Sequence, residues 1–294
     1  MTTTTTAVPP FRDIPSEEVD SDEHGGPPGS KSTTCNCGWA NKDQRRIVNG
    51  VETAVNEFPF MAAIIDRISR FQFCGGSIIT PYHALTAAHC TARYVFNGYP
   101  ISIVIGEHNL FTYEETSATK IIDVATIIQH SNFNWRTLKD DISLLFLAEK
   151  IEFNQFVGPV CISPVQLEIP RQYVKIIGWG KLVWQGPSPQ ALQKVNVRVL
   201  HRNSCNRVFP TVAEVNPTQI CTYASQKASC QGDSGGPVVW LDPETNRYVQ
   251  VGLVSFGTIC ADRNPTVHTD VPAYYNWIRA NIEGTYMNLK KIKN

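Results

Sequence analysis

The stretch KASCQGDSGGPVVW, residues 227–240, places Ser234 between Asp233 and two glycines. A serine hydroxyl is a weak nucleophile at neutral pH. It needs an adjacent base, a group that orients this base, and donors for a developing oxyanion. Glycines around Ser234 would let main-chain N–H groups approach a substrate carbonyl. A structural turn would explain the same letters, so the presence of a base and of an orienting group decides between the two interpretations.

Two other short motifs offer these partners. LTAAHC contains His89, followed directly by Cys90, and KDDISLLFL contains Asp141 at the head of an apolar run. A buried aspartate without a partner is energetically expensive, so we expect Asp141 to accept a hydrogen bond. Each residue alone is weakly diagnostic, because a lone histidine is more often a packed or surface side chain. Together, the three residues fit the roles of nucleophile, base and orienting group.

The motifs TAAHC, DDISLL and GDSGGP, in this order, resemble the chymotrypsin-like serine proteases nearly letter for letter. The resemblance implies an all-β fold of two six-stranded Greek-key β-barrels with a C-terminal helix. It also implies the roles of that family's triad, in which His89 takes the proton of Ser234 and Asp141 orients the imidazole. The N–H groups of Gly232 and Ser234 would form the oxyanion hole. In LVSFG, Ser255 matches the serine that supports the buried aspartate.

The same resemblance implies that the chain is a zymogen. RRIVNG, residues 45–50, lies where a polar head meets the apolar body of the sequence. Cleavage after Arg46 would free the amine of Ile47, which in the family inserts beside the aspartate that precedes the nucleophile, here Asp233. This ion pair orders the oxyanion hole and the specificity pocket, so we expect the intact chain to be nearly inactive.

The primary specificity pocket is expected to be apolar and shortened. Six residues before the nucleophile, trypsin-like relatives carry an aspartate, whereas this chain has Ala228. A buried cation without a partner would cost several kcal/mol, of order 3–5, so a preference for Lys or Arg is rejected. Gly257 leaves one wall open, and Thr266 stands where open-pocket relatives carry glycine. We therefore expect elastase-like cleavage after aliphatic residues, with aromatic residues as the alternative, and activation by another, trypsin-like protease.

Nine cysteines indicate an oxidising compartment. By resemblance they form Cys74–Cys90, Cys205–Cys221, Cys230–Cys260, and a link from Cys161 to either Cys35 or Cys37. The last bond would keep the head attached after cleavage, and the sequence leaves the choice open. The odd cysteine suggests an intermolecular bond or a missing partner. A metal site at CNC is the rival interpretation, but no histidine cluster follows it, and we assign no metal ligand there.

Secretion is inferred from the cysteines. The first residues show neither a charged n-region nor an apolar h-region, so no signal peptide is visible and we expect an N-terminal portion to be missing. No apolar run approaches the 18 residues of a membrane span. Lys plus Arg equals Asp plus Glu, at 26 each, which gives no indication of nucleic acid. The expected partners are protein or peptide substrates, a trypsin-like activating protease and a protein inhibitor, with neither nucleic acid nor membrane.

Short, roughly alternating β-type runs separated by turn residues dominate the chain from Ile47 onward. The runs are FQFCGGSII, ISIVIGEH, KIIDVATIIQ, DISLLFL, YVKIIGWG, LQKVNVRVL, GGPVVW and YVQVGLVSFG. Near the end, AYYNWIRANI places Tyr274, Trp277, Ile278 and Ile282 at helical spacing. The predicted organisation is a disordered head (1–34), an activation segment with the cysteine link (35–46), a protease domain (47–283) with barrels at about 47–160 and 161–272, and a basic tail (284–294).

Two alternatives accompany this interpretation. Glu107, Glu114 and Glu115 lie in a loop where some relatives bind calcium, but we favour a solvated acidic loop and expect no required cofactor. A catalytically silent homologue that acts as a binding partner is the rival function. Such homologues usually lose a triad member, which this chain retains. The stretches CGW, RRIVNGVETAVNEFPF and CGGSIITP most resemble those of serine proteases of hymenopteran venom and other secreted insect proteases.

Overall fold

The structure is a computed structural model that describes most of the chain. The described residues are 36–41, 51–112, 116–182, 185–212, 217–224, 229–258 and 264–292. Several residues singled out in the sequence lie outside these ranges, namely Cys35, Arg46, Ile47, Glu114, Glu115, Ala228 and Cys260.

Six antiparallel strands close the first barrel. They are β2 (Met61–Asp66), β3 (Gln72–Thr80), β4 (His83–Thr86), β5 (Ile101–Ile105), β6 (Lys120–Gln129) and β7 (Ser143–Leu147), joined in the order β2-β3-β4-β7-β6-β5. The strands are rich in Ile, Val and Leu, residues that suit a pleated, half-buried surface. Their inward-facing side chains form one buried cluster that includes Ile64, Ile103 and Leu145. Closure removes the exposed edges that an open sheet would present.

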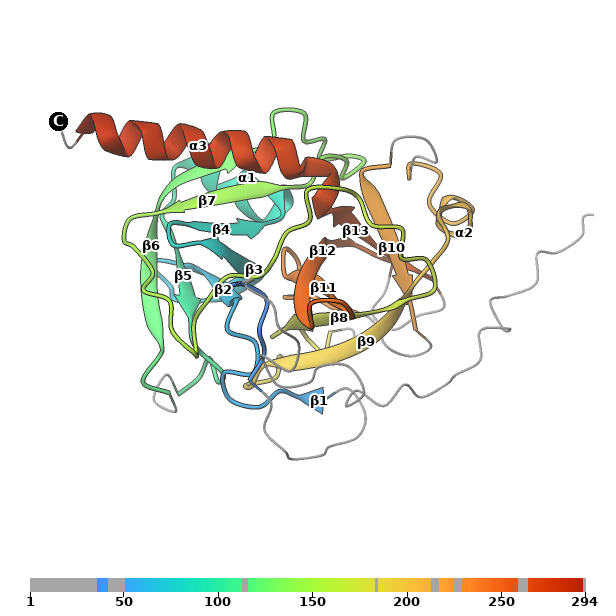
Figure 1. The fold of residues 1–294 in the computed structure, drawn as a ribbon, viewed down its shortest axis with the longest axis horizontal. Coiled ribbons are helices and arrows are strands. Elements are labelled where there is room, and N and C mark those ends of the chain that lie inside the picture. The colour runs from blue at the N-terminus through green and yellow to red at the C-terminus, as the bar shows by residue number, and fades with distance from the viewer. Residues whose placement is uncertain are drawn as a thin grey trace, which may run out of the picture.

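The second barrel follows the same plan. Its strands are β8 (Tyr173–Gly178), β9 (Gln193–Val199), β10 (Gln219–Tyr223), β11 (Pro237–Asp242), β12 (Arg247–Phe256) and β13 (Thr266–Asp270). They join in the order β9-β10-β13-β12-β11-β8, and a further pairing of β9 with β8 closes the sheet. Figure 1 shows the two barrels side by side. The prediction of two six-stranded β-barrels is thus confirmed.

The first described strand belongs to the second barrel, although it precedes the first barrel in sequence. The two-residue β1 (Val51–Glu52) pairs with β9, with Val51 opposite Lys194. Lys194 also forms a largely buried ion pair with Glu57, with Nζ 2.7 Å from Oε1. The chain that follows the expected cleavage site is therefore fastened to the second barrel before it enters the first.

The two barrels share a buried interface. One apolar cluster combines Phe60 and Val104 of the first barrel with Ile177 and Val239 of the second. Polar bonds cross the same interface: Ser77 Oγ donates to Gln250 Oε1 at 2.7 Å, and Trp179 Nε1 donates to the His108 carbonyl at 2.8 Å. Because these groups are buried and paired, they hold the barrels in a fixed relation, and side chains from both can meet at the junction.

The described part of the chain has four helical segments: α1 (Ala88–Asn97), α2 (Arg202–Asn206), η1 (Val271–Tyr274) and α3 (Tyr275–Ile292). The helix predicted near the end is present, and it continues through most of 284–294, which the sequence had indicated as a separate basic tail. Although α3 follows the last strand of the second barrel, it extends over the first (Figure 1). There His83 Nε2 lies 2.7 Å from Thr285 Oγ1. None of the helices in the described part of the chain has the length and apolarity that crossing a bilayer requires.

Candidate active site at the barrel junction

His89 lies in the first turn of α1, directly after strand β4. Strand β4 pairs with β7 so that Thr86 lies opposite Ser143. This pairing brings His89, three positions after the end of β4, close to Asp141, two positions before the start of β7. Helix α1 was not predicted from the sequence. Gly98 ends it in the left-handed conformation with φ 67°. Glycine adopts this conformation without strain, so Gly98 is a sequence signal that could have predicted the end of this helix.

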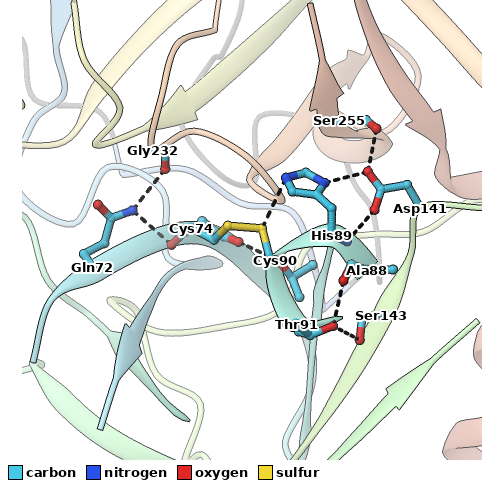
Figure 2. Close-up of a disulfide and its surroundings, with 12 residues drawn as sticks. Gln72, Cys74, Ala88, His89, Cys90, Thr91, Asp141, Ser143, Gly232 and Ser255 are labelled. Carbon is cyan, nitrogen blue, oxygen red and sulfur yellow. Dashed lines mark hydrogen bonds and ion pairs between the residues drawn. A yellow bond between two sulfur atoms is a disulfide. The ribbon is translucent and has the colours of Figure 1, made fainter. Parts of the chain in front are cut away.

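Asp141 holds the histidine through two hydrogen bonds. His89 Nδ1 lies 2.7 Å from Asp141 Oδ2, and the His89 main-chain N–H donates to Oδ1 at 2.8 Å. The side chain of Asp141 is fully buried, whereas that of His89 is 18% exposed. The carboxylate therefore fixes the tautomer with the proton on Nδ1, which leaves Nε2 as the nitrogen that can accept a proton. Figure 2 shows this arrangement.

The second barrel completes the surroundings of Asp141. Ser255, in strand β12, donates to Asp141 Oδ2 at 2.5 Å, and Thr269, in strand β13, donates to the Asp141 main-chain carbonyl at 2.8 Å. The buried aspartate thus has the partners that its burial requires. Ser255 lies where the sequence predicted it, whereas Thr269 had no sequence signal.

The segment that carries Ser234 is held between the barrels by main-chain hydrogen bonds. Gly75 N–H, in strand β3, donates to the Ser234 carbonyl, and Gly235 N–H donates to the Val254 carbonyl, both at 2.8 Å. Gly235 has φ 74°, and a side chain there would collide with Thr86 Oγ1. The glycine that follows the serine is thus required by close contact with the chain leading to His89.

Among the described residues, no hydrogen bond joins Ser234 Oγ to His89 Nε2. The recorded contact of Nε2 is with Cys90 Sγ at 3.7 Å. Hydrogen bonds between nucleophile and base are often long without substrate and shorten in the reacting complex. The structure therefore brings His89, Asp141 and Ser255 into direct contact and fastens the Ser234 main chain beside them.

The main-chain N–H groups of Gly232 and of Ser234 itself are available to a ligand. The carbonyl of Gln231 accepts from Lys181 N–H at 2.8 Å, and that of Asp233 accepts from Gly236 N–H at 2.9 Å. Because a trans peptide directs its N–H opposite to its C=O, the N–H groups of Gly232 and Ser234 point away from these partners. Neither group donates to any described residue. This is the arrangement that an oxyanion hole needs.

Asp233 points away from this pair of donors, into the protein. Its Oδ1 accepts Gly180 N–H and its Oδ2 accepts Cys230 N–H, each at 2.8 Å. Burial raises the pKa of Asp233 to about 6, and the two main-chain donors oppose this rise in pKa. Asp233 is thus separate from the triad. The amine of Ile47, its expected partner, lies outside the described residues.

Three disulfides are described: Cys37–Cys161, Cys74–Cys90 and Cys205–Cys221. The choice that the sequence left open is thus resolved in favour of Cys37. Cys230 is also disulfide-bonded, and its partner lies outside the described residues. In Figure 2, Cys74–Cys90 lies between His89 and the Gly232 segment. The bond therefore clamps the start of α1 to strand β3 at the centre of the site.

The residues predicted to line the specificity pocket are only partly described. Gly257 follows strand β12 and Thr266 begins β13; a methyl group added to Gly257 would lie 3.7 Å from Thr266 Cγ2. These two residues are therefore neighbours, as opposite walls of one pocket would be. Ala228, the predicted floor, is outside the described residues.

Glu107 is buried, and its side chain binds main-chain groups of the turn in which it lies. Its Oε1 accepts the N–H groups of His108 and Asn109, at 2.9 and 3.2 Å, whereas Oε2 has no described partner. The single group of three potential metal ligands among the described residues is Cys74, His89 and Cys90. Its two sulfurs are joined in a disulfide, so they are not thiolate ligands. Glu114 and Glu115, the other acidic residues of the predicted loop, lie outside the described residues.

Comparisons with known proteins agree with this geometry. The family model described as Trypsin matches residues 47–278. A venom serine protease of Polistes dominula is 39% identical over 261 residues, which cover 87% of this chain and 92% of the relative. Venom serine protease 34 of Apis mellifera is 37% identical over 84% of this chain and 60% of its own length. Trypsin of Sus scrofa is 36% identical over 82% of this chain and 97% of its own length.

The double barrel, the matched family and these relatives define the class of the protein as a serine-type endopeptidase. Within that class, the chain belongs to the trypsin family.

Proposed function

We propose that this chain is the zymogen of a secreted endopeptidase that cleaves after non-basic residues once it has itself been cut after Arg46. One observation carries the catalytic part of the proposal. The buried Asp141 holds His89 through Nδ1, which leaves Nε2 able to accept a proton, and the N–H groups of Gly232 and Ser234 have no partner among the described residues.

In the proposed reaction, Ser234 Oγ attacks the carbonyl carbon of the scissile bond and transfers its proton to His89 Nε2. The carbonyl π electrons move onto oxygen, where the N–H groups of Gly232 and Ser234 stabilise the negative charge. Collapse of this intermediate breaks the C–N bond, and the leaving amine takes the proton from His89. A water molecule then repeats the sequence and releases the acid, with Asp141 stabilising the imidazolium in both halves.

Activation is proposed to operate through Asp233. Its carboxylate is buried, with two main-chain donors and no described cation beside it. An ammonium group at Ile47 would provide the compensating charge that a buried carboxylate lacks. Asp233 lies between the two oxyanion donors in sequence, so its position affects both. This supports a chain that gains activity when cleavage after Arg46 creates the new amine.

The proposed substrate preference depends on Ala228, Gly257 and Thr266. Thr266 is largely buried and faces Gly257, which supports a cavity shortened from one wall. Without an acidic floor, the pocket would accept an aliphatic side chain in preference to Lys or Arg. The chain would therefore not activate itself efficiently, and a separate trypsin-like protease is required. The reaction uses side chains and main-chain N–H groups of this chain only, so we propose no cofactor.

Secretion and a venom setting are supported by the names of the relatives. Two of them are named venom serine proteases, and a 30% identical relative from Tachypleus tridentatus is named proclotting enzyme. The three disulfides among the described residues agree with an oxidising compartment.

The test is a peptide-library cleavage profile in EDTA-containing buffer, after limited trypsin treatment has produced a verified Ile47 terminus and trypsin has been removed. Ser234→Ala, treated identically, is the control. Cleavage after Val, Ala, Leu or Thr, absent in the control, supports the proposal. Dominant cleavage after Phe or Tyr would contradict the shortened pocket. No cleavage at all despite the correct terminus would favour the silent homologue, a binding protein with the same fold.

A further inference from the structure

Gln72 connects the first barrel to the segment that holds the oxyanion donors. It is the first residue of strand β3, and its side-chain amide donates to two main-chain carbonyls, those of Cys74 and Gly232, each at 3.0 Å. A primary amide has two N–H groups, so both are used. The second bond joins residues 160 positions apart in the sequence. In Figure 2 the Gln72 side chain extends from its strand to the Gly232 carbonyl.

Gly232 lies between two tethered peptide planes. The preceding peptide is held by Lys181 N–H at the Gln231 carbonyl, at 2.8 Å. The following peptide is held by Gln72 at the Gly232 carbonyl. Gly232 itself has φ 102°, in a region that favours glycine. The same following peptide is also held at its other end, where Asp233 N–H donates to the Cys230 carbonyl at 3.0 Å. A glycine can rotate easily between its two peptides, so these tethers together keep the two peptides in their relative orientation. Gln72 is the one tether that comes from a side chain.

Strand β3 contacts this segment at two points. Gln72 binds the Gly232 carbonyl, and three residues later Gly75 N–H binds the Ser234 carbonyl at 2.8 Å. The same strand is joined to helix α1 by Cys74–Cys90, next to His89. Strand β3 thus positions the base, the nucleophile and the oxyanion segment relative to each other. Of the two hydrogen bonds from this strand to the segment, the one from Gln72 is at Gly232 itself.

We propose that Gln72 is a positioning residue for the oxyanion hole, which acts by holding the Gly232–Asp233 peptide, the link between the peptides that carry the Gly232 and Ser234 N–H groups, so that both donors keep their orientation toward the reacting oxygen. Gln72 does not touch the substrate. The proposal rests on the proposed function, because it assigns a partner to the oxyanion hole of that site. Its effect belongs to the transition state, where the oxygen becomes negatively charged, and substrate binding should be little affected.

Two substitutions remove the donor groups while keeping the length of the side chain. Gln72→Met has no polar atom, and Gln72→Glu replaces the amide by acceptor oxygens that face two carbonyls. The matched control is Gln166→Met, because Gln166 also donates twice, to the Pro217 carbonyl and to Asp270 Oδ2, both at 2.8 Å, away from residues 230–236. Each variant is activated to a verified Ile47 terminus. The measurements are kcat and KM on an amide substrate, the affinity for a peptide boronic acid, and the thermal midpoint.

Gln72→Met loses both hydrogen bonds, and loss of the one to Gly232 predicts a kcat about 10-fold lower with KM within about 2-fold of wild type. The affinity for the boronic acid, whose tetrahedral adduct places an oxygen in the oxyanion hole, should fall by a similar factor. Gln72→Glu should behave alike, whereas Gln166→Met should keep the wild-type kcat and boronate affinity. The thermal midpoints of Gln72→Met and Gln166→Met should change comparably.

An unchanged kcat and boronate affinity in Gln72→Met would overturn the proposal. So would a loss of activity that accompanies failure to fold, because Gln72 would then be purely structural. Labelling of wild-type Ser234 by a fluorophosphonate distinguishes failure of the proposed function from failure of the positioning role of Gln72. If the activated wild type is not labelled, the proposed function fails; if it is labelled and Gln72→Met retains wild-type kinetics, only the positioning role fails.

Discussion

Ser255 donates to Oδ2 of Asp141 at 2.5 Å, the same carboxylate oxygen that lies 2.7 Å from His89 Nδ1. The two donors come from different barrels, because His89 begins helix α1 beside the first barrel and Ser255 lies in strand β12 of the second. Asp141 is fully buried, so these bonds replace its hydration. Any change in the relative position of the barrels would therefore disturb the orientation of the imidazole.

Replacing Ser255 by alanine should impair catalysis without abolishing it. A hydrogen bond to a charged group contributes about 1.5–3 kcal/mol, which corresponds to about 10- to 100-fold in kcat if the whole contribution is lost in the transition state. Steady-state kinetics on the activated enzyme provide the measurement. Ser255→Thr keeps the hydroxyl and should stay within a few-fold of wild type. If Ser255→Ala kept the wild-type kcat, the hydrogen bonds from the His89 ring and main-chain N–H would be sufficient to hold the Asp141 carboxylate.

The buried Asp233 predicts a specific pH dependence of stability in the uncut chain. Its pKa is raised from 3.8 to about 6, so between these values the unfolded chain has released the proton that the folded chain still binds. The free energy of unfolding therefore falls as pH rises through this window. The difference of about 2 pKa units corresponds to about 3 kcal/mol at neutral pH.

Urea unfolding of the uncut protein at pH 4, 5, 6 and 7 measures this dependence, with Asp233→Asn as the reference because Asn does not titrate. As pH falls from 7 to 4, wild type should gain about 3 kcal/mol relative to Asp233→Asn. The other titrating groups, including Asp270, are common to both proteins and cancel. Parallel pH profiles for the two proteins would mean that the uncut chain already provides Asp233 with a positive partner.

The disulfide Cys37–Cys161 predicts how the activated protein migrates. After cleavage following Arg46, the head should remain attached without reductant and separate on reduction, because the two bonded cysteines lie on opposite sides of the cut. Denaturing gels with and without reductant give the readout. Cys37→Ser should release the head without reductant, whereas Cys35→Ser, its neighbour in CNC, should retain it. Retention in Cys37→Ser would assign the link to another cysteine.

The strand-rich body of the chain and the triad candidates could be predicted from local patterns, whereas the two barrels were expected only from the resemblance of the motifs to the chymotrypsin-like proteases. The β-type runs are long enough to show alternation, and the motifs around His89, Asp141 and Ser234 are contiguous. Other features depend on contacts that are distant in sequence. Gln72 finds its acceptor 160 positions away, and nothing in FQFCGG indicates this bond. The two-residue strand β1 exists only because β9 is there to pair with it. The letters CNC do not distinguish Cys35 from Cys37, because the partner of Cys37, Cys161, lies 124 positions away in the sequence.

Thr266 predicts a defined change in substrate preference. It faces Gly257 across a space where an added methyl group would already be in van der Waals contact, so Thr266→Gly should lengthen the pocket. Preference should shift from Val or Ala toward Phe or Tyr, by about 1–3 kcal/mol for each methylene accommodated. Competition kinetics on paired peptides measure the ratio of kcat/KM values. Thr266→Val keeps the shape and should keep the wild-type preference; an equal shift in both variants would contradict a steric role.

The central claim is that Ser234 becomes a nucleophile, through His89 and Asp141, when the chain is cut after Arg46. The most direct measurement is fluorophosphonate labelling followed by peptide mass spectrometry, on uncut protein and on protein with a verified Ile47 terminus. We predict a single adduct, on Ser234, that forms rapidly in the cut protein, is far slower in the uncut protein and is absent in His89→Ala. Equal labelling of cut and uncut protein would contradict activation by cleavage, and no adduct on Ser234 in the cut protein would contradict catalysis itself.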